Sequence, residues 1–182
     1  MNYRLLEINK IINNAQNIRP INAAIVGTKI RQVVWLYEST HSGGASIMME
    51  SPSKRYEVPA QTLNEIVEKY IDLDDNVLLK MDVEGAEFDI FRSLDADLLR
   101  RIRFIVMETH LRYGTLSDII EKLKLADFKI NYFHSPLLAK HAKPRVEVED
   151  LLELKILKSI IYLIVSMGKL RTEDLVILFA YR

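Results

Sequence analysis

The segment at residues 80–87, Lys-Met-Asp-Val-Glu-Gly-Ala-Glu, places the strongest constraint on the fold. The apolar run at residues 77–79 leads into it and predicts a buried strand, and an amphipathic helix pattern follows it. Asp82 and Glu84 therefore lie where a strand ends and a helix begins, the edge of an open α/β sheet at which ligands bind. Because the two residues are two positions apart, an extended backbone would direct them to the same side. They are our first candidates for catalysis.

Glu87 completes the acidic segment and is expected in the first turn of the following helix. The helix dipole favours a negative charge there, and acidic residues at such junctions often only cap the helix. This structural explanation is sufficient for Glu87 alone. We therefore leave Glu87 out of the candidate site.

Glu108 ends the strand predicted at residues 104–108, and His110 follows it two positions later. If this strand is parallel to the one before Asp82, both residues lie at the same sheet edge. A carboxylate can orient an imidazole, and the imidazole can accept a proton near neutral pH. The alternative is a histidine that is hydrogen-bonded to a backbone carbonyl near a helix cap.

The same groups could instead bind a divalent metal ion, because carboxylate oxygens and imidazole nitrogens are ligands of such ions. Sequence alone does not show whether the side chains converge, so our interpretation assigns no metal ligand. Under the metal alternative the candidate ligands are Asp82, Glu84, Glu87, Glu108 and His110.

Helix and strand patterns alternate along the chain, which predicts a single α/β domain over residues 1–182. Thr62 followed three residues later by Glu65 is a capping-box pattern. Loops are expected at residues 41–53 and 137–146. The expected helices are at residues 3–14, 62–70, from 84 onward, 97–101, 115–125 and 148–167, and the expected strands are at residues 19–26, 32–37, 56–59, 77–82, 104–108, 128–133 and 175–181.

Composition limits the class of protein. The 182 residues include 25 Lys plus Arg and 25 Asp plus Glu, a balance that argues against a nucleic-acid or membrane-surface binder. The absence of cysteine rules out disulfides and a thiolate zinc site, and it fits a cytoplasmic protein. The longest apolar stretch, residues 156–167, contains Lys158 and Ser159 and is too short to span a bilayer.

Residues 82–87 (DVEGAE) resemble the Asp-x-Glu-Gly-Ala-Glu signature of FkbM-type methyltransferases, which use S-adenosylmethionine. Order and spacing agree with that family from about residue 2 to about residue 133. Four further segments are similar to the family's third strand, its Gly/Ser-rich loop, its "VPVTTLDDL" segment and its fifth strand ending in Glu-x-His: residues 21–27 (INAAIVG), 42–46 (SGGAS), 58–66 (VPAQTLNEI) and 104–110 (FIVMETH).

The resemblance implies a Rossmann-like methyltransferase sheet that is mostly parallel, with a C-terminal antiparallel strand. It implies S-adenosylmethionine as cofactor and a small-molecule hydroxyl, such as that of a sugar, as methyl acceptor. The residues that it assigns to catalysis are Asp82, Glu84, Glu108 and His110, and those that it assigns to the cofactor are Asn22, Ala23 and Asp82.

The chain departs from the family at its N-terminal side. Members begin with a strand, a Gly-rich turn that holds the methionine end of the cofactor, a helix, and a second strand with an acidic end. Here the only adjacent glycines, Gly43 and Gly44, follow no buried strand and open no helix. We therefore expect the first strand–helix–strand unit to be missing and the sheet to have unpaired edges.

Three explanations of this departure stay open. The chain is one part of a longer methyltransferase, or its strands have rearranged or are completed by a second chain. In the third, it is a non-catalytic relative that binds a protein partner through its open sheet edge.

Overall fold

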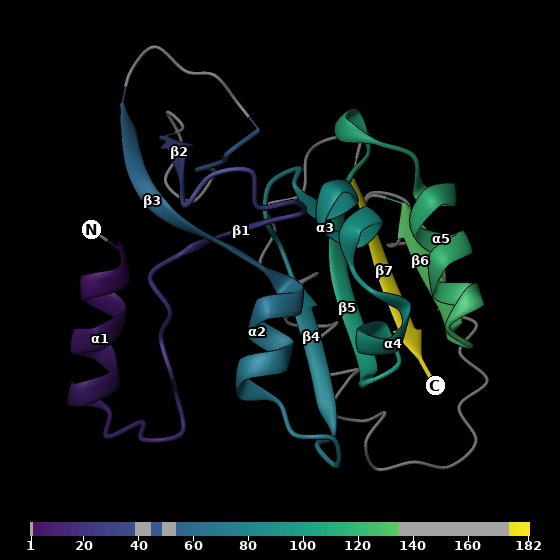
Figure 1. Cartoon of the computed structure of the whole chain (residues 1–182), viewed down its shortest axis with the longest axis horizontal. Helices are drawn as coiled ribbons and strands as arrows, with labels where there is room; N and C mark the ends of the chain where they lie inside the picture. Colours follow the sequence, from purple (N-terminus) through teal and green to yellow (C-terminus); the bar gives the residue numbers. More distant parts are fainter. Residues whose placement is uncertain (1, 39–44, 49–53, 135–174) are drawn as a thin grey trace.

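The computed structural model describes residues 2–38, 45–48, 54–134 and 175–182. The loop expected at residues 137–146, the helix expected at 148–167 and most of the loop at 41–53 lie outside these residues. The described strands form one sheet of three strands and one of four (Figure 1). The architecture is therefore α/β, as expected, but divided between two sheets.

The three-stranded sheet has the order β1-β3-β2. It follows the first helix, α1 (Asn2–Ile12), and comprises β1 (Ala24–Val26), β2 (Val33–Tyr37) and β3 (Arg55–Thr62). β3 is parallel to β1 and antiparallel to β2. In Figure 1 α1 and β2 lie on the left, and β1 extends from the left to α3 in the middle of the molecule.

The helix α2 (Leu63–Tyr70) follows β3 directly and begins at the predicted capping box. The Thr62 hydroxyl accepts a hydrogen bond from the Glu65 backbone N–H at 3.1 Å, and the Glu65 carboxylate accepts one from the Thr62 N–H at 2.9 Å. These bonds satisfy two backbone donors that the start of a helix leaves unpaired. The local sequence therefore determines where α2 begins.

The four-stranded sheet has the order β4-β5-β7-β6. Its strands are β4 (Val77–Met81), β5 (Ile102–His110), β6 (Lys129–His134) and β7 (Leu175–Tyr181). β4 and β5 are parallel, and β7 is antiparallel to both of its neighbours. The predicted C-terminal antiparallel strand is thus confirmed, and it lies between β5 and β6.

Three helices lie on one face of the four-stranded sheet: α3 (Glu87–Ser93), α4 (Ala96–Leu99) and α5 (Leu116–Leu125) (Figure 1). The 3-10 turn η1 (Leu111–Tyr113) connects β5 to α5. The core between these helices and the sheet contains the fully buried side chains Phe91, Leu99, Ile105, Leu123 and Leu178. The packed core thus supports β4 and β5, the strands that lead to the predicted site.

The prediction of a mostly parallel sheet is wrong. Of the five strand pairings in the described residues, β1–β3 and β4–β5 are parallel and the other three are antiparallel. The antiparallel pairings arise because β3 runs back along β2 and because β7 lies between β5 and β6. Among the described strands, β4 has a partner on one side only.

Several boundaries differ from the predicted ones. The strand expected at residues 19–26 is reduced to β1, because only three of its residues pair with β3. β5 extends to His110 because it pairs with β7 along most of its length. Within residues 2–38, 45–48, 54–134 and 175–182, no helix has the length and apolar character needed to cross a bilayer.

Candidate active site at the carboxyl ends of β4 and β5

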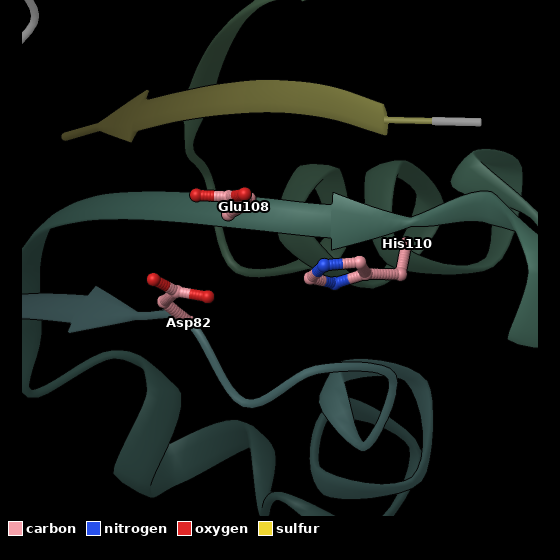
Figure 2. A group of neighbouring side chains, drawn as sticks. All are labelled: Asp82, Glu108 and His110. Carbon is pink, nitrogen blue, oxygen red and sulfur yellow. The ribbon is translucent and has the colours of Figure 1, made fainter. Parts of the chain in front are cut away.

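The parallel pairing of β4 and β5 brings two of the predicted acidic residues to one edge. Met81 is the register partner of Met107, so Asp82 and Glu108 follow at the same level of the sheet. Figure 2 shows the side chains of Asp82, Glu108 and His110 converging at this edge. One ligand atom from each lies within 4.8 Å of the other two. The expected placement of Asp82, Glu108 and His110 at one sheet edge is thus confirmed, and their side chains converge there, which the sequence left open.

A tight turn between β4 and α3 brings Glu84 to the same place. The strand ends at Met81, and both Glu84 (φ 52°) and Gly85 (φ 109°) have left-handed backbone conformations. The expected extended backbone and the expected helix start at Glu84 are both wrong, since the helix begins at Glu87. The turn places Glu84 Oε2 3.5 Å from His110 Nε2.

Two neighbours hold this turn. The Ser46 hydroxyl donates a hydrogen bond to the Glu84 carbonyl at 2.8 Å. A Cβ atom at Gly85 would lie 2.4 Å from Cδ2 of the Tyr113 ring, so the ring packs directly on the glycine backbone. Glycine is required here for both its positive φ and its missing side chain.

Glu87 is the residue that our sequence interpretation left out. Its side chain is fully buried, and its Oε1 accepts a hydrogen bond from the Gly85 N–H at 3.1 Å and lies 2.9 Å from His110 Nδ1. Its Oε2 has no hydrogen-bond partner among the described residues. The available signal was its place in the same acidic run, but an ordinary helix-start role explained that place equally well.

His110 is held by this carboxylate, and not by the backbone carbonyl that we considered as an alternative. Burial lowers the pKa of His110, but its hydrogen bond to Glu87 and the charges of Glu87, Glu84 and Glu108 outweigh that effect and raise the pKa above 6.5. The imidazole is thus oriented by one buried carboxylate and surrounded by others. It can exchange a proton at Nε2.

Burial also raises the pKa of Glu84 and of Glu108 above 4.5. In both cases the charge of His110 opposes the shift, and the charge of Asp82 adds to it. Asp82 is an exposed residue and pairs with Lys80, whose Nζ lies 3.1 Å from Asp82 Oδ2. A carboxyl with a raised pKa is suited to proton transfer closer to neutral pH.

The structure does not join the predicted cofactor residues Asn22 and Ala23 to this cluster. Both precede β1, where Asn22 is exposed and Ala23 is half-buried. A cavity of about 510 Å³ lies between the end of β1 and α3, a volume within the range of ligand pockets. Its lining includes Val26, Gly27 and Asp89, but not Asn22, Ala23 or Asp82.

The comparison with protein families agrees with this arrangement. The model of the methyltransferase FkbM domain matches residues 4–130, which is more than half of the chain and includes the whole acidic cluster. We found no match among curated proteins or among solved structures. On the strength of the family match, the chain belongs to the FkbM methyltransferase family.

Proposed function

We propose that this protein transfers a methyl group from S-adenosylmethionine to a hydroxyl of a small molecule, such as a sugar. The observation that carries the proposal is the convergence of acidic side chains and one imidazole at the end of β4 and β5, in a chain of a methyltransferase family. Ligands of open α/β sheets bind at this edge. We also propose that the protein works in the cytoplasm, which its lack of cysteine favours.

The proposed roles follow from position and charge. His110, oriented by Glu87, would accept the proton of the acceptor hydroxyl. Glu84 and Glu108 would bind the acceptor through its hydroxyl groups, because each keeps carboxylate oxygens at the same edge. Positioning the acceptor oxygen contributes as much as proton removal, since methyl transfer requires an in-line approach.

S-adenosylmethionine supplies an electrophilic methyl group on a positively charged sulfur. The acidic cluster complements that charge, and Asp82 would lie nearest to it. Asn22 and Ala23, which precede β1, would run beside the adenosine portion. The sequence has no Gly-rich turn of the family type, so we assign no residue to the methionine end of the cofactor.

The test is methyl transfer by the full chain. Isotope-labelled S-adenosylmethionine is incubated with a panel of sugars and other small-molecule alcohols, and labelled ethers are separated and counted. We expect H110Q to reduce the transfer rate by about 100-fold or more, because a positioned base contributes at least that much. D97N is the matched control, since the Asp97 side chain is 96% exposed and its ion pair among the described residues is with its helix neighbour Arg100. Full activity in a folded H110Q protein would contradict the proposed role.

A second candidate is a binding module without catalysis. One observation favours it: β4 has a strand on one side only among the described strands. An unpaired edge exposes N–H and C=O groups that a strand of another polypeptide can pair with. A stable complex with a protein partner, formed by a chain that does not bind S-adenosylmethionine, would support this candidate over the enzyme.

A further inference from the structure

The side chains of Asp82, Glu108 and His110 form a set of metal-ligand type at one edge of the sheet (Figure 2). They offer two carboxylate oxygens and one imidazole nitrogen within 4.8 Å of one another. Ligand atoms of one octahedral ion, at bond lengths of about 2.1 Å, lie about 3 to 4 Å apart. Small side-chain rotations would therefore bring these atoms onto a single ion.

Buried Glu87 fixes the ring of His110, an arrangement that suits a metal-binding histidine as well as one that transfers a proton. Its Oε1 engages His110 Nδ1 at 2.9 Å, which leaves Nε2 as the nitrogen that faces the acidic edge. Histidines that bind metals generally donate their second N–H to a carboxylate in this way, which fixes the ring and strengthens the ligand. Glu87 is fully buried, and its Oε2 has no hydrogen-bond partner among the described residues.

The charges around His110 leave a negative excess. Four carboxylates lie there, those of Asp82, Glu84, Glu87 and Glu108. Among the residues that the structure describes, the cations that act on the half-buried carboxylates are Lys80 and His110. With all four carboxylates ionised and both of these cations charged, the described groups carry an excess of two negative charges. A divalent cation would neutralise that excess.

We propose that Asp82, Glu108 and His110 bind a divalent cation of the Mn²⁺ type, with Glu87 as the residue that positions His110. Imidazole nitrogen favours transition metals, whereas carboxylate and water oxygens favour Mg²⁺ and Mn²⁺, so Mn²⁺ accepts the whole set. Three protein ligands leave coordination positions for water or for two oxygens of an acceptor. When the ion is bound, His110 Nε2 is a ligand, so Glu84, whose Oε2 lies 3.5 Å from that nitrogen, would accept the acceptor proton in its place. That use on an acceptor rests on the proposed methyl transfer, but binding of the ion does not.

The first test is a titration of the full chain with Mn²⁺ alone, after removal of bound metals. Free Mn²⁺ is followed by its electron paramagnetic resonance signal, which decreases when the ion binds protein. We expect one saturable site per chain. D82N and E108Q should weaken it by about 100-fold or more, because loss of a ligand exceeds the loss of an outer partner. D97N, the exposed control, should bind Mn²⁺ as the wild type does.

The second test separates positioning from coordination. Coupling of the bound Mn²⁺ to an imidazole nitrogen, measured by pulsed paramagnetic resonance, should be present in the wild type and in D97N and absent in H110Q. E87Q keeps all three ligands, so it should retain a site that is about 10- to 100-fold weaker. A merely structural role of Glu87 would change stability without changing the affinity of the folded protein for Mn²⁺.

The inference is overturned if the folded wild type shows no saturable Mn²⁺ binding, or if D82N, E108Q and H110Q bind as tightly as the wild type. These outcomes do not depend on methyl transfer. Mn²⁺ binding without binding of S-adenosylmethionine would leave the metal site standing and remove the proposed function. Methyl transfer by a chain that binds no Mn²⁺ would support the proposed function and remove the metal site.

Discussion

Glu87 connects three parts of the site from a position that solvent does not reach. It links the turn at Gly85 to His110 on β5 and begins α3. Replacement by alanine would leave a cavity and two donors without their acceptor. We expect E87A to reduce the free energy of unfolding by about 3 kcal/mol. Urea denaturation measures this, with D97A as the exposed control.

For the control, D97A should stay within about 0.5 kcal/mol of the wild type, because surface changes away from special features have small effects. If E87A were as stable as D97A, the linking role of Glu87 would be wrong. The buried contacts in the described residues would then not determine how His110 is held.

Glu108 gives a pH-dependent prediction. Its pKa is raised above 4.5 in the folded protein, so the folded state binds a proton more tightly than the unfolded state. Its contribution to stability is therefore fully present below about pH 4.5 and is lost as the pH rises through its folded pKa. E108Q cannot ionise, so it should gain stability relative to the wild type from pH 4 upward (metal-free buffer, chemical denaturation at several pH values).

Glu65 supplies a control of opposite sign. Hydrogen bonds from the Thr62 backbone and from Lys29 lower its pKa below 4.5. Its contribution is present above about pH 4.5 and lost as the pH falls through its folded pKa. E65Q should therefore lose stability relative to the wild type as the pH rises. Equal or reversed trends for the two variants would contradict the electrostatic description of the site.

The turn between β4 and α3 is the element on which the site depends most. Gly85 has φ 109°, and the Tyr113 ring occupies the space that a side chain would need. We expect G85A to reduce the free energy of unfolding by about 2 kcal/mol or more, since a non-glycine residue in such a conformation costs about 1 to 3 kcal/mol. Thermal or urea unfolding tests this. A G85A protein within about 0.5 kcal/mol of the wild type would show that the turn relaxes freely.

Boundaries that depend on nearby residues could be predicted from the sequence. Boundaries that depend on strand pairing with distant residues could not. Thr62 and Glu65 predicted the start of α2, because a capping box is read within four residues. β1 and β5 departed from their predicted lengths, because strand length depends on partners that are distant in the chain. Hydrophobic periodicity does not encode the direction of a neighbouring strand, so the antiparallel pairing of β2 with β3 was not predicted. The antiparallel direction of β7 was expected from the family resemblance alone.

The site shows the same division. The shared edge of Asp82, Glu108 and His110 could be predicted because parallel strands end at the same side of a sheet. Their roles stay predictions. The positive φ of Glu84 could not be predicted, since it depends on the packing of Gly85 against Tyr113. Asn22 and Ala23 were assigned by resemblance alone, and their cofactor role stays a prediction.

The whole molecule depends on a strand outside the family match. The matched residues end at 130, but β7 lies between β5 and β6, and Leu178 is fully buried in the core. We expect L178A to cost about 3 kcal/mol of unfolding free energy, the usual range for a buried leucine. L125A, whose side chain is 73% exposed, is the matched control. Equal stability of the two variants would mean that β7 does not hold the sheet together.

The central claim is that this chain carries a working methyltransferase site, and binding of S-adenosylmethionine to the purified full chain tests it most directly. Isothermal calorimetry should show one saturable site per chain, weakened at least about 10-fold in D82N through loss of a charge that complements the sulfonium. D97N should bind as the wild type does. A folded wild-type protein that takes up no S-adenosylmethionine, or a D82N protein that binds it equally well, would contradict the account.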